Sequence, residues 1–171
     1  MRGLGRRRAG RLVRMCAVVA AAFWSCESMV AAEQRVLPAF EVEAPEGLTV
    51  SSEQLSADAQ WLMVYVSPTC AACDRLLELM AARQSPAAAA RTVVIVAGER
   101  AAARAYVAAR HGVAPAMRLY ADVTMQAARA LALSGSPSIV AIRRGQIEWV
   151  LTGVLNDPDA LEPVIRAWVE Y

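Results

Sequence analysis

Two kinds of hydrophobic pattern alternate along the chain. Short, mostly apolar runs predict buried strands that are covered on both faces, and they lie at residues 61–66, 92–96, 117–120, 138–142 and 146–151. Elsewhere, apolar residues recur every three or four positions, which predicts helices with one buried stripe. These segments lie at residues 70–84 and 159–169. Further helices are predicted at 99–111, which is rich in alanine and arginine, at 125–133 and, after a serine cap, at 52–60.

Three weaker signals complete the pattern. Residues 39–43 alternate between apolar and polar positions between two prolines, so we interpret them as an edge strand. Residues 87–90 follow Pro86 and form either a linker or a last helical turn. Residues 143–145 separate the last two strands and predict a hairpin. Strands that alternate with helices, followed by a hairpin and a closing helix, predict an α/β domain with a central mixed β-sheet flanked by helices.

The first 32 residues have the composition of an export signal. Arginines at positions 2, 6, 7, 8, 11 and 14 stand without an acid, residues 15–24 are apolar, and small residues end the stretch at Ala32. A basic region, an apolar core and small residues before the cleavage point are the parts of a secretory signal. We therefore predict a signal peptide at residues 1–32 and a folded domain at residues 33–171. The alternative is an uncleaved membrane anchor, although the apolar run is short for a span.

Removal of this segment reverses the net charge. The full chain carries 18 basic and 16 acidic residues, a net charge of +2. Six arginines and one acid precede residue 33, so the remainder carries 12 arginines and 15 acids, or about −3. A basic surface for nucleic acid is therefore not predicted. Cys16 and Cys26 fall in the signal, which leaves Cys70 and Cys73 to bond each other or a partner.

The candidate chemistry lies at Cys70-Ala71-Ala72-Cys73, where the strand at 61–66 passes into the helix at 70–84. Unpaired backbone N–H groups and the positive end of the helix dipole stabilise a thiolate at such a place. The thiolate is the form of cysteine that attacks a disulfide. We interpret Cys70 as the nucleophile and Cys73, one turn further into the helix, as the resolving thiol.

Other uses of two nearby cysteines fit this sequence less well. Tetrahedral zinc needs four nitrogen or sulfur ligands, and beyond the signal the chain has two cysteines and His111, which we interpret as a surface residue. Haem attachment needs histidine after the second cysteine, where Asp74 stands. A static disulfide closing so short a loop contributes little stability. Binding of Cu(I) by the two soft thiolates remains a rival hypothesis.

A second motif lies just before the predicted hairpin, at residues 135–138, Gly-Ser-Pro-Ser. Pro137, Gly145 and Gly153 follow one another at intervals of eight residues. With the CxxC after a strand and the closing helix, these features resemble the thioredoxin-like superfamily over roughly residues 48–170. The extra strand and helix at residues 92–122, and Ser-Pro-Thr before Cys70, are similar to TlpA-like and MauD-like envelope thioredoxins.

The resemblance implies a thioredoxin fold with a strand–helix insertion between the CxxC helix and a cis-proline loop. It implies a thiol–disulfide oxidoreductase with Cys70 and Cys73 as the redox pair. Pro137 would lie across from Cys70 in a cis peptide, and Ser136 would offer backbone hydrogen bonds to a substrate. Pro68 and Thr69, directly before Cys70, complete the implied substrate-binding residues. No metal and no cofactor other than the redox-active disulfide Cys70–Cys73 is implied.

The chain also departs from the thioredoxin pattern. Thioredoxins carry a buried acid on the strand before the CxxC, and the matching position here, around Val64, is apolar. Thr69 replaces the tryptophan that precedes the first cysteine in that family. The residues between the cysteines are both alanine, which add neither charge nor side-chain hydrogen bonds to tune the thiolate. Cys70 must therefore rely mainly on the N–H groups at the helix terminus.

The function expected from the sequence is an exported thiol–disulfide oxidoreductase of the periplasm. Its expected partners are cysteine-containing envelope client proteins and a membrane or periplasmic electron donor or acceptor, with no nucleic acid. It would keep a client's cysteines reduced or mature a client enzyme. Two alternatives stay open: a copper metallochaperone of thioredoxin fold, and a non-catalytic thioredoxin-fold assembly module.

The other prominent side chains have ordinary structural interpretations. Arg100, Arg104 and Arg110 recur along the predicted helix at 99–111 and are interpreted as a solvated helix face, with a docking patch as the alternative. Trp61, Trp149 and Trp168 are isolated in the sequence, so we expect them to cover the sheet or fill its core.

Overall fold

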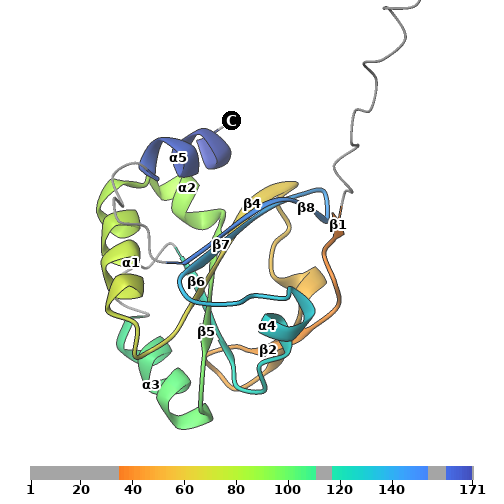
Figure 1. The fold of residues 1–171 in the computed structure, drawn as a ribbon, viewed down its shortest axis with the longest axis vertical. Helices are drawn as coiled ribbons and strands as arrows, with labels where there is room; N and C mark the ends of the chain where they lie inside the picture. Colours follow the sequence, from red (N-terminus) through yellow and green to blue (C-terminus); the bar gives the residue numbers. More distant parts are fainter. Residues whose placement is uncertain (1–34, 111–116, 154–160, 171) are drawn as a thin grey trace, which may run out of the picture. The chain divides into compact units, whose positions relative to one another are not determined.

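The five apolar runs form the middle of one eight-stranded sheet (Figure 1). The computed structural model describes residues 35–110, 117–153 and 161–170. Its strand order is β1-β8-β7-β4-β5-β6-β2-β3. The strands are β1 (Arg35–Val36), β2 (Glu41–Glu43), β3 (Thr49–Ser51), β4 (Gln60–Val66), β5 (Thr92–Ala97), β6 (Arg118–Asp122), β7 (Ser138–Arg143) and β8 (Gln146–Thr152).

The sheet is mixed, as predicted. Strands β4, β5 and β6 run parallel to one another. Strand β7 pairs antiparallel with β4 on the other side, and the hairpin β7–β8 continues the sheet outward. Strand β4, which leads to the cysteines, therefore lies between a parallel and an antiparallel neighbour in the centre of the sheet.

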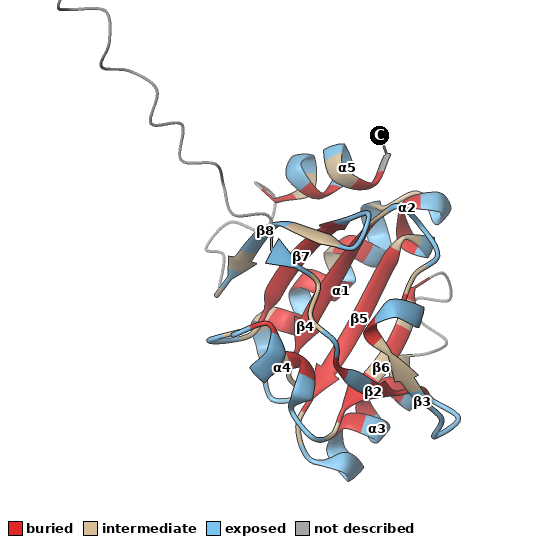
Figure 2. Cartoon of the chain, turned by 90° about the vertical axis from the view of Figure 1, so that its right-hand side faces the viewer, coloured by how far each residue is buried: buried red, intermediate tan, exposed pale blue. Residues whose placement is uncertain are grey.

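Helices cover both faces of this sheet (Figure 1). On one face lie α1 (Ala71–Arg83), α2 (Pro86–Ala90), α3 (Arg100–Arg110) and α5 (Glu162–Glu170), whose buried residues share one apolar cluster. On the other face lies the short helix α4 (Gln126–Ala130), together with apolar residues from the segment before β4. The central strands are buried from end to end (Figure 2) because neither face is left to solvent.

Side chains of β4 alternate between the two clusters, as the pleat requires. Leu62, Val64 and Val66 point to the cluster under α1. The residues between them, Met63 and Tyr65 among others, point to the cluster that contains α4. Both sets are almost fully buried, so the strand before the cysteines is held firmly on both sides.

Aromatic side chains attach the closing helix α5 to the sheet, as predicted for the isolated tryptophans. The indole of Trp168 donates a hydrogen bond from Nε1 to the carbonyl oxygen of Trp61 at 3.2 Å. The ring of Trp168 also meets Trp149 of β8 edge-on, with 5.6 Å between the ring centroids. The guanidinium carbon of Arg143 lies 4.6 Å from the Trp168 ring centroid. Trp61 is buried, and the other two cover the sheet.

The prediction of a helix at residues 52–60 is wrong beyond the first turn. Only a 3-10 turn forms there, η1 (Ser52–Gln54). Leu55 is then fully buried, and Ser56 and Asp58 form a side-chain turn in which the Asp58 N–H donates to Ser56 Oγ at 3.2 Å. Such local side-chain bonds compete with helix formation, and β4 already begins at Gln60.

Two other elements also differ from the sequence prediction. Helix α4 is shorter than the predicted 125–133 because Met125 and Ala132 have positive φ angles of 58° and 52°. Residues 86–90 are a separate helix, α2, because the Ser85 side chain accepts a hydrogen bond from the Ala88 N–H and so caps a new start.

The N-terminal strands also depart from expectation. The strand predicted at residues 39–43 is not at the edge, since β2 lies between β6 and β3. Strands β1 and β3, two and three residues long, were not predicted. The predicted signal at residues 1–32, His111 and the start of the predicted helix at 159 lie outside the described residues. Among the described residues, no helix has both the length and the apolar character needed to cross a membrane.

Two arginines of α3 hold β2 through Glu43. The carboxylate of Glu43 is almost buried and pairs with Arg104 and with Arg100, the latter at 3.5 Å. The hydrogen bond from Arg104, followed by the charges of both arginines, holds the pKa of Glu43 below its usual value against the opposing effect of burial. The predicted solvated helix face is therefore partly engaged in ion pairs.

This lowered pKa predicts a pH-dependent part of the stability. Because the folded pKa of Glu43 lies below that of an unfolded glutamate, about 4.3, its contribution is present above that pH and is lost as pH falls through the folded pKa. We expect Glu43→Gln to lower the urea midpoint at pH 7 and to have a vanishing effect at strongly acid pH. Urea titrations of both proteins across the acid range test this. An equal effect at both ends of the range would contradict it.

Candidate functional site

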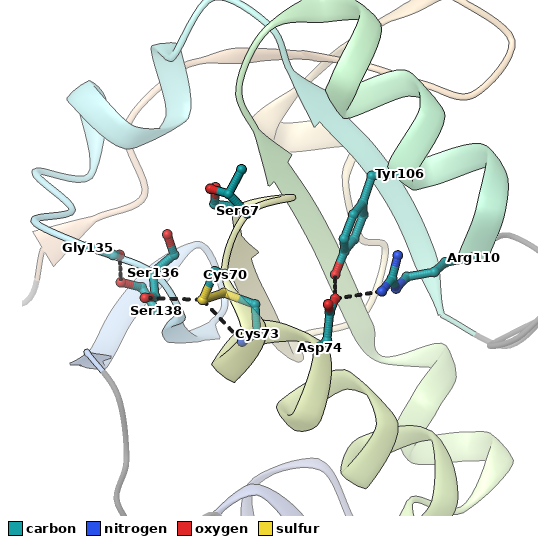
Figure 3. Close-up of a disulfide and its surroundings, with 10 residues drawn as sticks. Ser67, Cys70, Cys73, Asp74, Tyr106, Arg110, Gly135, Ser136 and Ser138 are labelled. Carbon is teal, nitrogen blue, oxygen red and sulfur yellow. Dashed lines mark hydrogen bonds and ion pairs between the residues drawn. A yellow bond between two sulfur atoms is a disulfide. The ribbon is translucent and has the colours of Figure 1, made fainter.

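The two cysteines lie where β4 ends and α1 begins (Figure 3). The chain leaves the sheet after Val66 and turns at residues 67–69, and the N–H of Cys70 donates to the carbonyl oxygen of Ser67 at 3.1 Å. Cys70 is the N-cap residue of α1, in an extended conformation, and its Sγ accepts a hydrogen bond from the Cys73 N–H at 3.1 Å. The first cysteine thus takes the place that a serine or aspartate usually fills at a helix start.

Cys70 and Cys73 form a disulfide, with their Cα atoms 5.2 Å apart. The two cysteines differ in exposure: Cys73 is fully buried in the cluster under α1, while Cys70 is partly exposed beside it. An external sulfur atom therefore meets Cys70 first.

A loop from the C-terminal half faces Cys70. The Ser136–Pro137 peptide bond is cis, as the resemblance implied. The carbonyl oxygen of Ser136 lies 3.6 Å from the Cys70 Sγ, although the two residues are 66 positions apart. The hydroxyl of Ser138 donates to the carbonyl oxygen of Gly135 at 2.7 Å, and the Gly153 N–H donates to the carbonyl oxygen of Pro137 at 3.0 Å. The hairpin β7–β8 thus fixes this loop against the disulfide (Figure 3).

Pro68 and Thr69 lie on the turn that leads into Cys70. Thr69 is exposed, with its Oγ1 3.3 Å from the Oγ of Ser67. Pro68 is half-buried beside Gly98, where a Cβ would lie 3.7 Å from the Pro68 Cδ. Gly98 has a φ of +128°, which other residues rarely adopt. The structure therefore gathers all six residues named for the site at the end of β4, around the exposed sulfur.

One feature of this region was not predicted from the sequence. Asp74, the residue after Cys73, accepts a hydrogen bond on Oδ1 from the Tyr106 hydroxyl and another from Arg110 Nη2, each at 2.6 Å. The Arg110 guanidinium carbon also lies 3.7 Å from the Tyr106 ring centroid. The only indication in the sequence was the spacing of Tyr106 and Arg110, four residues apart on one predicted helix. That spacing did not indicate that either residue contacts Asp74.

These contacts affect the protonation of Tyr106. Burial, and then the hydrogen bond to Asp74, raise the pKa of Tyr106 well above its ordinary value, against the opposing charge of Arg110. The phenol therefore stays protonated and remains a hydrogen-bond donor throughout the neutral range.

The strand before the cysteines carries no buried acid, but a fully buried acid lies at the end of another strand, β6. Val64 is fully buried and apolar, as the sequence indicated. Asp122, at the end of β6, is also fully buried; its carboxylate accepts hydrogen bonds from the Tyr65 hydroxyl at 3.0 Å and from the Gln126 N–H at 2.8 Å. Because Asp122 accepts the hydrogen bond from the Gln126 N–H, it caps the start of α4. Tyr65 belongs to the cluster that contains α4, on the face of the sheet opposite α1.

Metal binding has little support in the described part of the chain. No group of three or more histidine, cysteine, aspartate or glutamate side chains is placed there to hold a metal ion. The two sulfurs of Cys70 and Cys73 are the soft ligands at this site, and a Cu(I) ion could bind them only after the disulfide is reduced.

Sequence comparison alone does not identify the chain. No protein-family model matches it, and no curated protein matches it in sequence.

Comparison with solved structures finds clear similarities in fold. The chain is similar to an uncharacterized thioredoxin-like protein from Porphyromonas gingivalis, with a TM-score of 0.63 and 21% identity over 78% of this chain and 92% of that one. It is similar to a protein from Chlorobium tepidum assigned as the thiol:disulfide interchange protein DsbE, with a TM-score of 0.61 and 20% identity over 80% and 96%.

A third similar structure is a secreted disulfide oxidoreductase from Mycobacterium tuberculosis that is homologous to DsbE. Its TM-score is 0.55, with 14% identity over 75% of this chain and 95% of that one. At such identities the likeness establishes the fold. The chain has the thioredoxin fold, with the extra strand and helix at residues 92–122 between the CxxC helix and the cis-proline loop.

Proposed function

We propose that this chain is an exported thiol–disulfide oxidoreductase that exchanges disulfides with cysteine-containing proteins of the cell envelope. One observation carries the proposal: in a disulfide at a helix N-terminus, one cysteine is partly exposed and the other is fully buried. The sulfur of the partly exposed Cys70 faces the loop at Ser136 and Pro137. A disulfide that served only to brace the fold would need neither the access nor the loop.

The exchange reaction follows from the different burial of the two sulfurs. In the reduced protein, the Cys70 thiolate attacks one sulfur of a client disulfide, and a mixed disulfide forms as the client's other sulfur leaves as a thiolate and takes up a proton. The Cys73 thiol then loses its proton and attacks the Cys70 sulfur. The Cys70–Cys73 disulfide forms, the client leaves with two thiols, and two electrons have passed to the client. The reverse sequence oxidises a client dithiol.

The start of α1 stabilises the attacking thiolate. The Cys73 N–H already points at the Cys70 Sγ at 3.1 Å, and a thiolate accepts this hydrogen bond more strongly than a neutral sulfur does. The helix dipole adds a favourable interaction at the same place. No side chain between the cysteines supplies charge, so these backbone groups provide most of the stabilisation.

We assign the client-binding role to the residues around the exposed sulfur. The carbonyl oxygen of Ser136 lies beside Cys70, so the backbone of Ser136 is placed to hydrogen-bond a client segment whose cysteine has reached Cys70. Pro137 sets the direction of that backbone. Thr69 and Pro68 form the opposite rim and contact the client segment from the other side.

Export to the periplasm is supported by residues 1–32, which have the three parts of a secretory signal. In an oxidising compartment, a client disulfide is an available substrate. The similarity to DsbE-like proteins and to a secreted oxidoreductase favours a role in reducing or maturing one envelope client. The cycle then needs a membrane or periplasmic electron donor or acceptor, and no cofactor besides the Cys70–Cys73 disulfide.

Reduction of insulin by dithiothreitol tests the activity. We expect the chain to accelerate the precipitation of the insulin B chain, and we expect Cys70→Ser and Cys73→Ser each to return the rate to that of dithiothreitol alone. A wild-type rate equal to that background would overturn the proposal.

The copper chaperone and the non-catalytic module both predict no acceleration of insulin reduction. Titration of the reduced protein with Cu(I), with counting of the remaining free thiols, separates these two alternatives from each other. Occupation of both thiols by one tightly bound ion would indicate the chaperone.

A further inference from the structure

The helix that carries the redox pair also carries an acid close to it. Asp74 lies one turn after Cys70, and its N–H donates to the carbonyl oxygen of Cys70 at 3.3 Å. Residues four apart lie on the same face of a helix, about 5 to 6 Å apart between Cβ atoms. A free carboxylate at that distance would repel the Cys70 thiolate and would compete with it for the positive end of the helix dipole.

Helix α3 engages this carboxylate from outside α1. Figure 3 shows the Asp74 side chain turned toward Tyr106 and Arg110, with both bonds made to its Oδ1. The ion pair is only partly shielded from water, since 29% of the Arg110 side chain and 35% of the Asp74 side chain are exposed. Burial and the hydrogen bond to Asp74 raise the pKa of Tyr106, so its phenol stays a donor to Asp74 over a wider pH range than an ordinary tyrosine would.

Other charged side chains near Cys70 and Cys73 do not compensate the charge of Asp74. The loops that face Cys70, residues 67–69 and 134–137, contain no charged side chain. On α1, Arg75 is exposed, and the charge of Glu78 acts on the same Tyr106 from one turn beyond Asp74. Asp122 belongs to the opposite face of the sheet, under α4. Among the described residues, the cation paired with the acid beside the cysteines is Arg110.

We propose that Arg110 is a positioning residue for the redox chemistry: by neutralising Asp74 and turning its carboxylate toward α3, it stabilises the Cys70 thiolate. The importance of this inference depends on the proposed function, but its experimental test does not. Its consequence is that the reactivity of the CxxC pair, whose two intervening alanines contribute no charge, is tuned from a helix of the inserted unit.

The proposal predicts opposite changes in the Cys70 thiolate fraction when Arg110 and when Asp74 is replaced. Arg110→Gln leaves an uncompensated carboxylate beside Cys70, so we expect about a three- to tenfold lower thiolate fraction at a fixed pH below the thiol pKa. Asp74→Asn leaves the cation without its acid, so the thiolate fraction should rise by a similar factor. The double variant should return to within about twofold of wild type, as expected when two charges act through each other.

Two further variants separate charge from packing. Arg110→Lys keeps the charge near Asp74 and should restore most of the wild-type thiolate fraction. Tyr106→Phe removes a hydrogen bond to Asp74 but no charge, so its effect should be clearly smaller than that of Arg110→Gln. If Arg110 had a purely structural role, Tyr106→Phe and Arg110→Gln would change the thiolate fraction by similar amounts. Asp74→Asn would then change the thiolate fraction in the same direction as both.

The measurement is the pH dependence of thiolate absorbance, or of alkylation by iodoacetamide, on the reduced protein without any client. Each variant is made in a chain whose Cys16 and Cys26 are replaced by serine, so that the signal comes from Cys70 and Cys73.

Opposite shifts of the thiolate fraction that cancel in the double variant support the proposal. Unchanged thiolate fractions, or shifts of one sign, overturn it. If Arg110→Gln does not fold, Asp74→Asn alone decides by the direction of its shift. Insulin reduction is judged separately, so failure of either proposal is recognised by itself.

Discussion

Replacing Cys73 by serine is expected to leave a long-lived mixed disulfide on Cys70, whereas replacing Cys70 by serine is expected to leave a nearly unreactive protein. The reason is burial, because Cys70 is partly exposed and Cys73 is fully buried. A buried thiol reacts only after local opening. We expect dithiobis(nitrobenzoate) to modify the remaining cysteine of Cys70→Ser on the order of 100-fold more slowly, which corresponds to an opening free energy of about 2.7 kcal/mol.

Release of thionitrobenzoate, together with the mass of the protein, measures this difference. The wild-type protein is the matched control, since Cys73 should displace the reagent from Cys70 and release a second equivalent without a lasting adduct. The Cys16→Ser, Cys26→Ser background again limits the signal to the pair. Equal modification rates in the two single variants would contradict the assignment of nucleophile and resolving thiol.

The largest loss of stability is expected from Asp122→Ala. The fully buried carboxylate accepts hydrogen bonds from the Tyr65 hydroxyl, from the Gln126 N–H and from the Ala128 N–H, the last at 3.3 Å. Removing it leaves the Tyr65 hydroxyl and the first turn of α4 without their acceptor. Hydrogen bonds to charged groups contribute about 1.5 to 3 kcal/mol each and do not add fully, so we expect a loss of about 3 to 4 kcal/mol.

Urea and thermal unfolding of the oxidised protein measure this loss, which should lower Tm by on the order of 10 °C. Tyr65→Phe is the matched control, because it removes one of the three bonds and should cost about 1.5 kcal/mol, the lower end of that range. The disulfide lies on the other side of the sheet, so insulin reduction by Asp122→Ala should persist below its unfolding temperature. A Tm within a few degrees of wild type would show that the network contributes little.

The central strands and the helix after the cysteines were predictable because their signals are local. A continuous apolar run such as 61–66 has one stable location, the middle of a sheet covered on both faces, and the structure buries every residue of it. The helix that follows has its apolar residues at helical spacing, and the prediction that it ends near residue 84 is confirmed by α1, Ala71–Arg83. The placement of the CxxC at a strand-to-helix turn followed from these two patterns together.

Short elements were missed or misjudged where the local signal was weak. Strands of two or three residues, such as β1 and β3, are too short to show an alternation and form only because a partner strand is already in place. The segment 52–60 begins at a serine that can cap a helix, but burial of Leu55 and the Ser56–Asp58 turn prevent the helix from continuing. Tertiary contacts outweigh intrinsic propensity, which amounts to less than about 1 kcal/mol per ordinary residue.

The sequence by itself determined the mixed α/β sheet, the helix start at Cys70 and the position of two cysteines one turn apart. These depend on contacts between residues that are close along the chain, where periodicity and spacing record the geometry directly. The family resemblance implied that the loop at Pro137 lies across from Cys70. Only the tertiary structure decided that Tyr106 and Arg110, 32 and 36 positions away, engage Asp74. Such contacts arise when the sheet brings distant segments to one end, and no pattern within either segment encodes them.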